Sequence, residues 1–185
     1  MNVIAYTAKR YERATRRVVG RRAVVITCPP YDDGYFVEGK IQYGLFGNYD
    51  LAVFNLHGFP NLPVWLGDDQ LIAMKGSTLS SQRHFAKGVF AINCNLGDIG
   101  HPMLQCLWDA GAEWVVAGDG LNYGGTMWPV GTDILLRWFR RSLEGKTPEQ
   151  ALVRAKKIAR WVAPQFTADQ RLALRDALKF EVHRN

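Results

Sequence analysis

The chain has 185 residues, 48% apolar and 22% charged, which suits a single domain over residues 1–185 with its own hydrophobic core. It has no run of 18 apolar residues and no charged-then-apolar leader, so we expect a cytoplasmic protein without a membrane span or signal peptide. Three cysteines, Cys28, Cys94 and Cys106, are an odd number without a close-spaced pair. This argues against a disulfide framework and against a four-ligand zinc site, and we expect no metal and no cofactor.

The formal charge is +6, and much of the excess lies in the strand and helix predicted within residues 1–22. This segment holds Lys9, Arg10, Arg13, Arg16, Arg17, Arg21 and Arg22, and a second basic group contains Arg137, Arg140 and Arg141. Clustered cations can hold an acidic protein or a nucleic acid. No nucleic-acid-binding motif accompanies them, so we interpret the run as a solvated helix face and expect no nucleic-acid partner. We interpret Trp65, Tyr123 and Trp128 as core and cleft wall.

The first half of the chain alternates apolar runs with a basic helical pattern. Residues 3–6 predict a strand, 9–19 a helix, and 23–28 a second strand that stops at Pro29 and Pro30. Residues 31–48 are rich in Gly, Asp and Tyr and predict a loop with at most a short element. Residues 51–56 and 89–93 are apolar without alternation, which is typical of parallel strands buried on both faces.

Helices dominate the second half. Pro102 and Gly111 bound a helix over residues 101–110, which leads into a strand over 112–117. Residues 131–143 carry an apolar stripe at helical spacing. Capping boxes that begin at Thr147 and Thr167 predict two further amphipathic helices. Together these elements predict an α/β three-layer sandwich with a mainly parallel sheet flanked by helices.

A histidine and a thiol each follow a predicted buried strand. His57-Gly58 follows residues 51–56, and Cys94 follows residues 89–93. In parallel sheets the functional crevice lies off the carboxyl ends of the strands, so we expect both side chains there. An imidazole can accept the thiol proton, and the thiolate can then attack an acyl carbon. Backbone N–H groups in the turn at Gly58 can approach the developing oxyanion closely.

The segments around these residues resemble a known family. Asp50 to Gly58 resembles the strand and His-Gly element of caspase-like cysteine peptidases, and Asn93-Cys94-Asn95-Leu96-Gly97 resembles the Cys turn of the CHAT subfamily. Residues 107–116, the Trp128-Pro129-Val130 segment and residues 136–157 are similar to later parts of the family, so the match covers residues 50 to 160.

The resemblance implies a caspase-hemoglobinase-like fold and limited proteolysis of a protein or peptide substrate. It implies that Cys94 is the nucleophile, that His57 is its base, and that the amides of Gly58 and Cys94 form an oxyanion hole. Several relatives carry an acidic residue two positions before the cysteine, where this chain has Ile92. Asp32, Asp119 and Asn122 are therefore the candidate substrate-binding residues.

Two other functions fit the same residues. The first is a catalytically inactive caspase-like fold that serves as a protein-binding or scaffold module. The second is another Cys-His acyl-transfer enzyme, such as a class I amidotransferase, although the tight Gly-x-Cys-x-Gly elbow of those enzymes is absent around Cys94. For the peptidase we expect regulation by a separate protein or by self-association.

Overall fold

The computed structural model describes residues 1–28, 45–82 and 84–185. Its strands are β1 (Val3–Ala8), β2 (Val24–Cys28), β3 (Leu51–Asn55), β4 (Val64–Leu66), β5 (Ile72–Lys75), β6 (Gly88–Ala91), β7 (Trp114–Ala117) and β8 (Glu181–Arg184). Its helices are α1 (Glu12–Val19), α2 (Gly76–Ser80), α3 (Pro102–Asp109), α4 (Gly131–Ser142), α5 (Pro148–Val162) and α6 (Ala168–Ala177). Short 3₁₀ turns η1 (Lys9–Tyr11), η3 (Asp68–Gln70) and η4 (Ala163–Gln165) complete the described elements.

Six strands form one mixed sheet in the order β2-β1-β3-β6-β7-β8. The first five are parallel, and β8 is antiparallel to β7. All residues of β3 and β6 are buried, as their continuous apolar runs predict. The α/β class with a mainly parallel sheet flanked by helices is therefore confirmed. A separate hairpin pairs β4 with β5.

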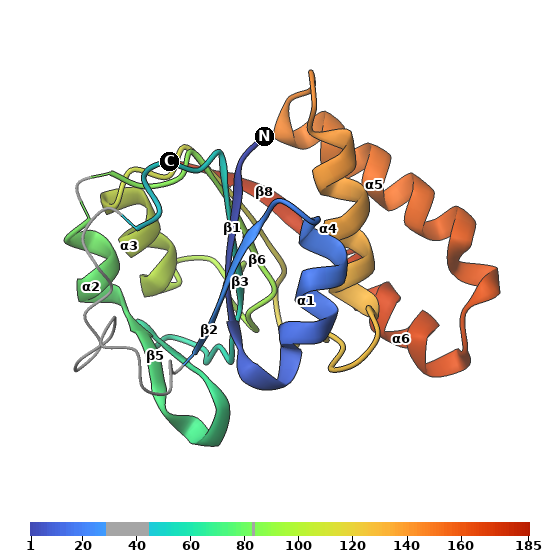
Figure 1. Ribbon diagram of the computed structural model, residues 1–185, viewed down its shortest axis with the longest axis horizontal. Coiled ribbons are helices and arrows are strands. Elements are labelled where there is room, and N and C mark those ends of the chain that lie inside the picture. Colours follow the sequence, from blue (N-terminus) through green and yellow to red (C-terminus); the bar gives the residue numbers. More distant parts are fainter. Residues whose placement is uncertain (29–44, 83) are drawn as a thin grey trace.

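The helices cover the sheet on both faces, which makes three layers (Figure 1). Leu79 of α2 and Met103 and Leu107 of α3 pack against one face. The other face receives Val18 of α1 and Phe139 of α4, together with residues of α5 and α6. Both predicted capping boxes are present, with the Thr147 and Thr167 hydroxyls accepting the Gln150 and Gln170 N–H groups at 3.3 Å.

The strand order places a topological switch between β1 and β3. The chain leaves β1 toward β2 on one side of the sheet and then returns to β3 on the other. In open α/β sheets this divergence opens a crevice at the carboxyl ends of the two strands. The segments that follow β1 and β3, which are η1 and the His57 turn, meet at this edge.

Some elements were not predicted from the sequence. Strand β8, the β4-β5 hairpin and α2 have no expected counterpart. The proposed stop at Pro29 and Pro30, and most of the predicted loop over 31–48, lie outside the described residues. Among the helices that the structure describes, none is both long and apolar enough to cross a bilayer.

Candidate functional site

His57 leaves β3 at the carboxyl edge of the sheet and is fixed there by its backbone. Its N–H donates to the Leu66 carbonyl at 2.8 Å, and the Leu66 N–H donates back to the His57 carbonyl at 2.9 Å. This bridge joins the end of β3 to β4, so the hairpin that the sequence does not predict holds the backbone of the candidate base. The His57 side chain is half-buried.

Cys94 lies three residues beyond β6, in a loop that is bonded to the loop after β7. Asn95 has a left-handed φ of 62° and donates its N–H to the Gly120 carbonyl at 2.7 Å. The Gly97 N–H donates to the Gly118 carbonyl at 3.0 Å. A Cβ on Gly97 would lie 2.7 Å from the Gly118 carbonyl carbon, so only glycine allows this approach.

Asn122 contacts the Cys94 thiol directly. Its N–H donates to Cys94 Sγ at 3.4 Å, and the thiol donates to the Asn122 carbonyl at 3.6 Å. The Asn122 amide Nδ2 donates to the Asn93 carbonyl at 2.8 Å. Across the described residues no hydrogen bond joins the thiol to the His57 imidazole. Asn122, predicted to bind substrate, is therefore the residue that positions the thiol.

The two strand ends nevertheless touch through their backbones. A Cβ on Gly58 would lie 2.3 Å from the Cys94 carbonyl oxygen and 3.0 Å from the Cys94 nitrogen. Within the described part of the chain, neither the Gly58 nor the Cys94 N–H has a hydrogen-bond partner. The predicted pair of oxyanion donors therefore consists of neighbouring, unengaged amides.

Two residues of η1 complete the surroundings of His57. The Tyr11 ring lies 5.5 Å from the imidazole, centroid to centroid, at an interplanar angle of 58°. Burial, and secondly the Arg10 charge, lower the pKa of His57, while Asp68 opposes them. Asp68 also accepts the Arg10 N–H at 2.9 Å. Burial raises the pKa of Tyr11, and the nearby Cys94 acts in the same direction. His57 is therefore held toward its neutral, proton-accepting form beside a protonated phenol.

His101 links α3 to the Gly58 turn. It is 2% exposed, its Nδ1 accepts the Met103 N–H at 3.1 Å, and its Nε2 lies 2.9 Å from the Phe59 carbonyl. Because Nδ1 accepts, Nε2 carries the proton and donates to Phe59. His101 therefore caps a helix and anchors the turn. In the described ranges no group of three or more His, Cys, Asp or Glu side chains could hold a metal ion.

A buried polar group lies at the N-terminus of α4. Asp133 is fully buried and accepts the N–H groups of Gly125 at 2.5 Å and Val130 at 3.3 Å. Burial raises the pKa of Asp133 to about 7. A Cβ on Gly124 would lie 3.3 Å from Asn55 Oδ1 and 3.6 Å from Asp133 Oδ2, so this loop separates the carboxyl from the end of β3.

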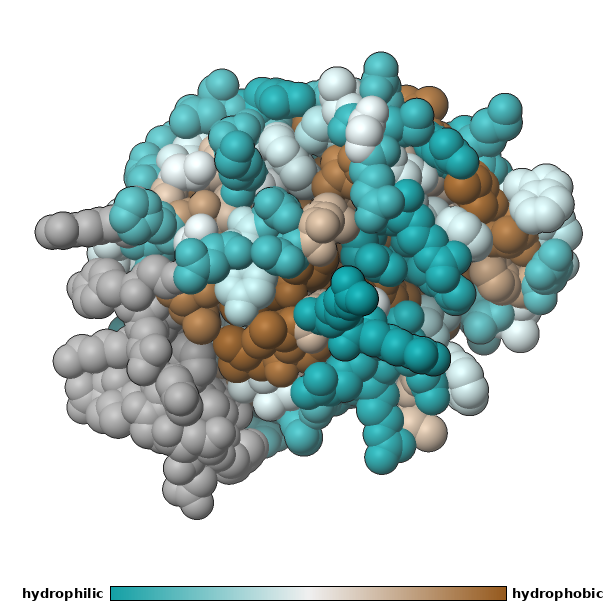
Figure 2. All heavy atoms as spheres, turned by 45° about the horizontal axis from the view of Figure 1, so that its top comes forward, coloured by the Kyte–Doolittle hydropathy of each residue, from teal (hydrophilic) through white to brown (hydrophobic). Residues whose placement is uncertain are grey.

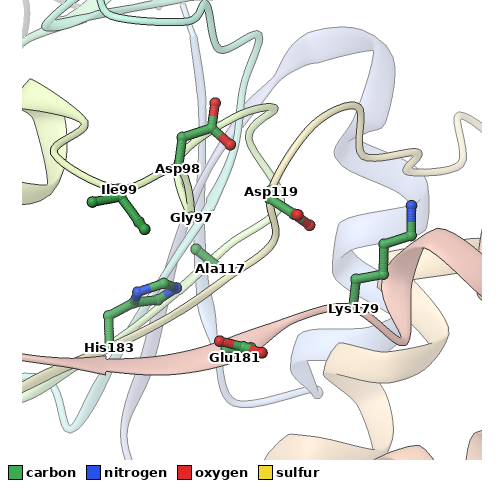
Figure 3. Close-up of a pocket in the computed structure, with 8 residues that line it drawn as sticks. All are labelled: Gly97, Asp98, Ile99, Ala117, Asp119, Lys179, Glu181 and His183. Carbon is green, nitrogen blue, oxygen red and sulfur yellow. The ribbon is translucent and has the colours of Figure 1, made fainter.

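A polar pocket of about 590 Å³ lies beside the loops that hold Cys94. Its charged side chains come from three segments, with Asp98 after β6, Asp119 after β7, and Lys179 and Glu181 at β8. Figure 3 shows His183 and Ile99 on one side of the pocket and Lys179 on the opposite side. The pocket is lined by three carboxylates and one ammonium group, so its net negative charge favours a cationic ligand.

The structure thus brings together most of the predicted site residues. His57, Gly58 and Cys94 meet at one edge, Asn122 holds the thiol, and Asp119 lines the neighbouring pocket. Asp32 lies outside the described residues. Four contributors were not assigned to the site from the sequence: Tyr11, Arg10, Asp68 and, as an anchor, His101. The position of Tyr11 shortly after the first strand is the one signal that could have indicated it.

Comparison with known proteins leaves the family open. The chain matches no protein-family model, and a search of curated proteins gives no significant match.

Proposed function

We propose that this chain is a cysteine endopeptidase of the caspase-like or CHAT type, with Cys94 as nucleophile and His57 as base. The observation that carries the proposal is the contact between the Gly58 and Cys94 backbones, whose N–H groups have no hydrogen-bond partner among the described residues. The sheet, with its helices on both faces, is compatible with the three-layer sandwich that the family resemblance implies.

The reaction follows from these groups. His57 accepts the thiol proton, and the Cys94 thiolate forms a bond to the carbonyl carbon of the substrate. The amides of Gly58 and Cys94 hold the oxyanion of the tetrahedral intermediate. When the C–N bond breaks, the imidazolium gives its proton to the leaving amine. A water molecule, deprotonated by His57, then hydrolyses the thioester and restores the thiol.

Rotation of the Cys94 side chain is part of this proposal. In the free protein the thiol is bonded to Asn122 rather than to His57. Catalytic hydrogen bonds are often long or misaligned before substrate binds. We propose that substrate in the cleft releases the thiol from the Asn122 carbonyl and turns it toward the imidazole.

The experiment is covalent labelling with peptidyl acyloxymethyl ketones that differ in the residue before the cut. We expect modification of Cys94, loss of labelling in His57→Ala, and no effect of Cys106→Ser, which changes another half-buried thiol. If Cys94 in the folded protein reacts no faster than free cysteine with every probe, the peptidase proposal fails.

The second candidate is an inactive fold that binds a partner. The bond between the thiol and Asn122, and the missing thiol–imidazole bond, favour it. The two functions differ in the phenotype of Cys94→Ala. An inactive module keeps its biological activity after this substitution, whereas a peptidase loses it.

A further inference from the structure

The positive charge of this protein is concentrated in one segment. Residues 9–22 contain seven cationic side chains and one acidic side chain, so their net charge equals the +6 of the whole chain. The rest of the chain is balanced. Six of the seven cations are arginines, whose planar guanidinium binds phosphate through two parallel hydrogen bonds.

The fold exposes these arginines on α1 and in the turns on either side of it. Helix α1 buries Ala14, Thr15, Val18 and Val19 against the sheet and α4, so its basic side chains are on the outer face. Figure 2 shows a dense group of hydrophilic side chains on the face where α1 lies in Figure 1. The one acid, Glu12, is paired with Lys9 and Arg16, at 2.8 Å each. Across the described residues, no carboxylate pairs with the remaining arginines of the segment, Arg10, Arg13, Arg17, Arg21 and Arg22.

Helix α4 continues this surface. It lies beside α1, and the Arg140 Nε donates to the Val18 carbonyl at 3.2 Å. Arg137 and Arg141 are exposed on α4, and their guanidinium carbons lie 5.8 and 5.2 Å from the centroid of the Trp138 ring. We define the Arg-Trp surface as these arginines of α1, the turn after it and α4, together with Trp128 and Trp138: Arg13, Arg16, Arg17, Arg21, Arg22, Arg137, Arg140 and Arg141.

An exposed tryptophan packs against α1. Trp128 is 65% exposed, and the Arg17 guanidinium carbon lies 3.9 Å from its ring centroid. Arg17 also donates to the Met127 carbonyl, and Arg13 donates to Met127 Sδ at 3.2 Å. Trp128 was predicted to belong to the core and cleft wall. It is not a core residue, because most of its side chain is exposed to solvent.

We propose that the Arg-Trp surface binds single-stranded nucleic acid. Guanidinium groups that have no carboxylate partner among the described residues neutralise the phosphates. The face of the Trp128 ring away from Arg17 stacks on an unpaired base. The carboxylates of an acidic protein can pair with the arginines, but such a protein has no nucleobase to stack on Trp128. The exposed Trp128 ring therefore favours nucleic acid over an acidic protein as the partner. The proposal departs from the expectation that the run is only a solvated helix face, because the sequence does not show Trp128 and α4 beside α1.

The test is fluorescence anisotropy of the full chain with a labelled oligo(dT) or oligo(U) of about 20 nucleotides. We expect binding that weakens steeply between about 50 and about 200 mM salt. The triple variant Arg17→Glu, Arg21→Glu, Arg22→Glu should bind at least about tenfold more weakly and show a smaller salt slope. Its matched control is Arg154→Glu, Lys157→Glu, Arg160→Glu, which changes the net charge equally through exposed residues of α5.

Stacking is tested separately. Trp128→Ala should weaken binding at least about fivefold with an unchanged salt slope, because it removes no charge. Trp161→Ala is the control, since Trp161 is 77% exposed on α5. Thermal unfolding checks that each variant is folded. Cys94→Ala should bind normally, so the result is independent of the proposed peptidase.

Three results would overturn the proposal. One is the absence of binding to either oligonucleotide at about 50 mM salt. Another is an equal loss of affinity in the Arg17, Arg21, Arg22 variant and in the α5 variant, which would reflect net charge alone. The third is displacement of the oligonucleotide by poly-L-glutamate at equal charge concentration, which would assign the surface to acidic proteins.

Discussion

The backbone of Gly58 lies against the backbone of Cys94, so closely that a Cβ at residue 58 would come within 2.3 Å of the Cys94 carbonyl oxygen. The Gly58 turn thus allows the ends of β3 and β6 to approach each other. Any side chain here must push the two turns apart. The contact depends on the absence of a side chain, since Gly58 is not among the residues with positive φ.

Gly58→Ala should separate the base from the nucleophile. We expect a loss of about 1 to 3 kcal/mol in the free energy of unfolding, the usual cost of overpacking. Labelling of Cys94 by the peptidyl ketone should slow by about 100-fold, because small displacements of reacting groups are costly. Urea unfolding and labelling rates measure the two effects.

The control is Gly100→Ala, where a Cβ would meet no atom within 4 Å but φ is +75°. It should cost about 1 to 2 kcal/mol of backbone strain and leave labelling unchanged. Equal labelling rates in Gly58→Ala and the native protein would contradict the proposed geometry.

Asn122→Ala should loosen the loop whose backbone holds the thiol. It removes the Nδ2 hydrogen bonds to the Asn93 and Gly118 carbonyls, which join the loops after β6 and β7. We expect a loss of about 1 to 3 kcal/mol in the free energy of unfolding. The rate at which Cys94 is labelled should change as well. The control Asn48→Ala, at an exposed position, should alter neither this rate nor the free energy of unfolding. Unchanged stability in Asn122→Ala would show that these hydrogen bonds do not hold the loops together.

The sequence predicts the parts of the site that depend on local pattern. Residues 51–56 and 89–93 are apolar without alternation, so both strands and the turns that follow them can be placed at one edge of the sheet. The capping boxes at Thr147 and Thr167 likewise identify two helix starts, because each capping signal lies within four consecutive residues.

What the sequence does not predict depends on strand order or on distant partners. Tyr11 meets His57 because β1 and β3 are neighbours, which one sequence cannot show. Strand β8 has the residues Glu-Val-His-Arg, half of them exposed, and it is an edge strand without the apolar run of β3. Its pairing with β7 supplies Glu181 and His183 to the pocket.

Arg10→Gln should raise the pKa of His57. The Arg10 charge lowers this pKa in the native protein, after burial, which is the larger cause. Removing the charge makes the imidazole easier to protonate, so protonation should occur at higher pH in the variant. NMR titration of the imidazole measures the shift directly. Lys9→Gln is the matched control because it removes a neighbouring exposed charge that has no such effect on His57. A lower His57 pKa in Arg10→Gln would contradict this electrostatic account.

Asp119→Asn should reduce preference for cationic substrates. Asp119 is one of three carboxylates in the 590 Å³ pocket beside the Cys94 loop. If the pocket receives the side chain before the cut, peptides with Lys there should have a higher kcat/KM than matched peptides with Gln. Because Asp119 is exposed, the variant should lower this ratio by about threefold, the usual effect of losing one solvent-exposed ion pair. Asp169→Asn, an exposed change on α6, should leave the ratio unchanged. If the native protein had a higher kcat/KM for the peptides with Gln than for those with Lys, the pocket would be excluded as the cation-binding site.

Asp133→Asn should change how stability depends on pH. Burial raises the pKa of Asp133 from 3.8 to about 7, so the folded chain keeps this proton over a range in which the unfolded chain has lost it. Folding therefore binds a proton in that range, and the free energy of unfolding falls as pH rises from about 4 through about 7. The whole fall attributable to this group is on the order of 4 kcal/mol.

The Asn side chain still offers an acceptor to the Gly125 N–H but cannot ionise. Relative to the native protein, Asp133→Asn should therefore gain stability between about pH 4 and about pH 7, and the difference should level off above about pH 7. Urea unfolding across this range measures the difference, with Asp169→Asn as a control at an exposed aspartate. Parallel stability curves for the native protein and Asp133→Asn would mean that Asp133 is already ionised in the fold. The two backbone N–H groups of Gly125 and Val130 would then outweigh its burial.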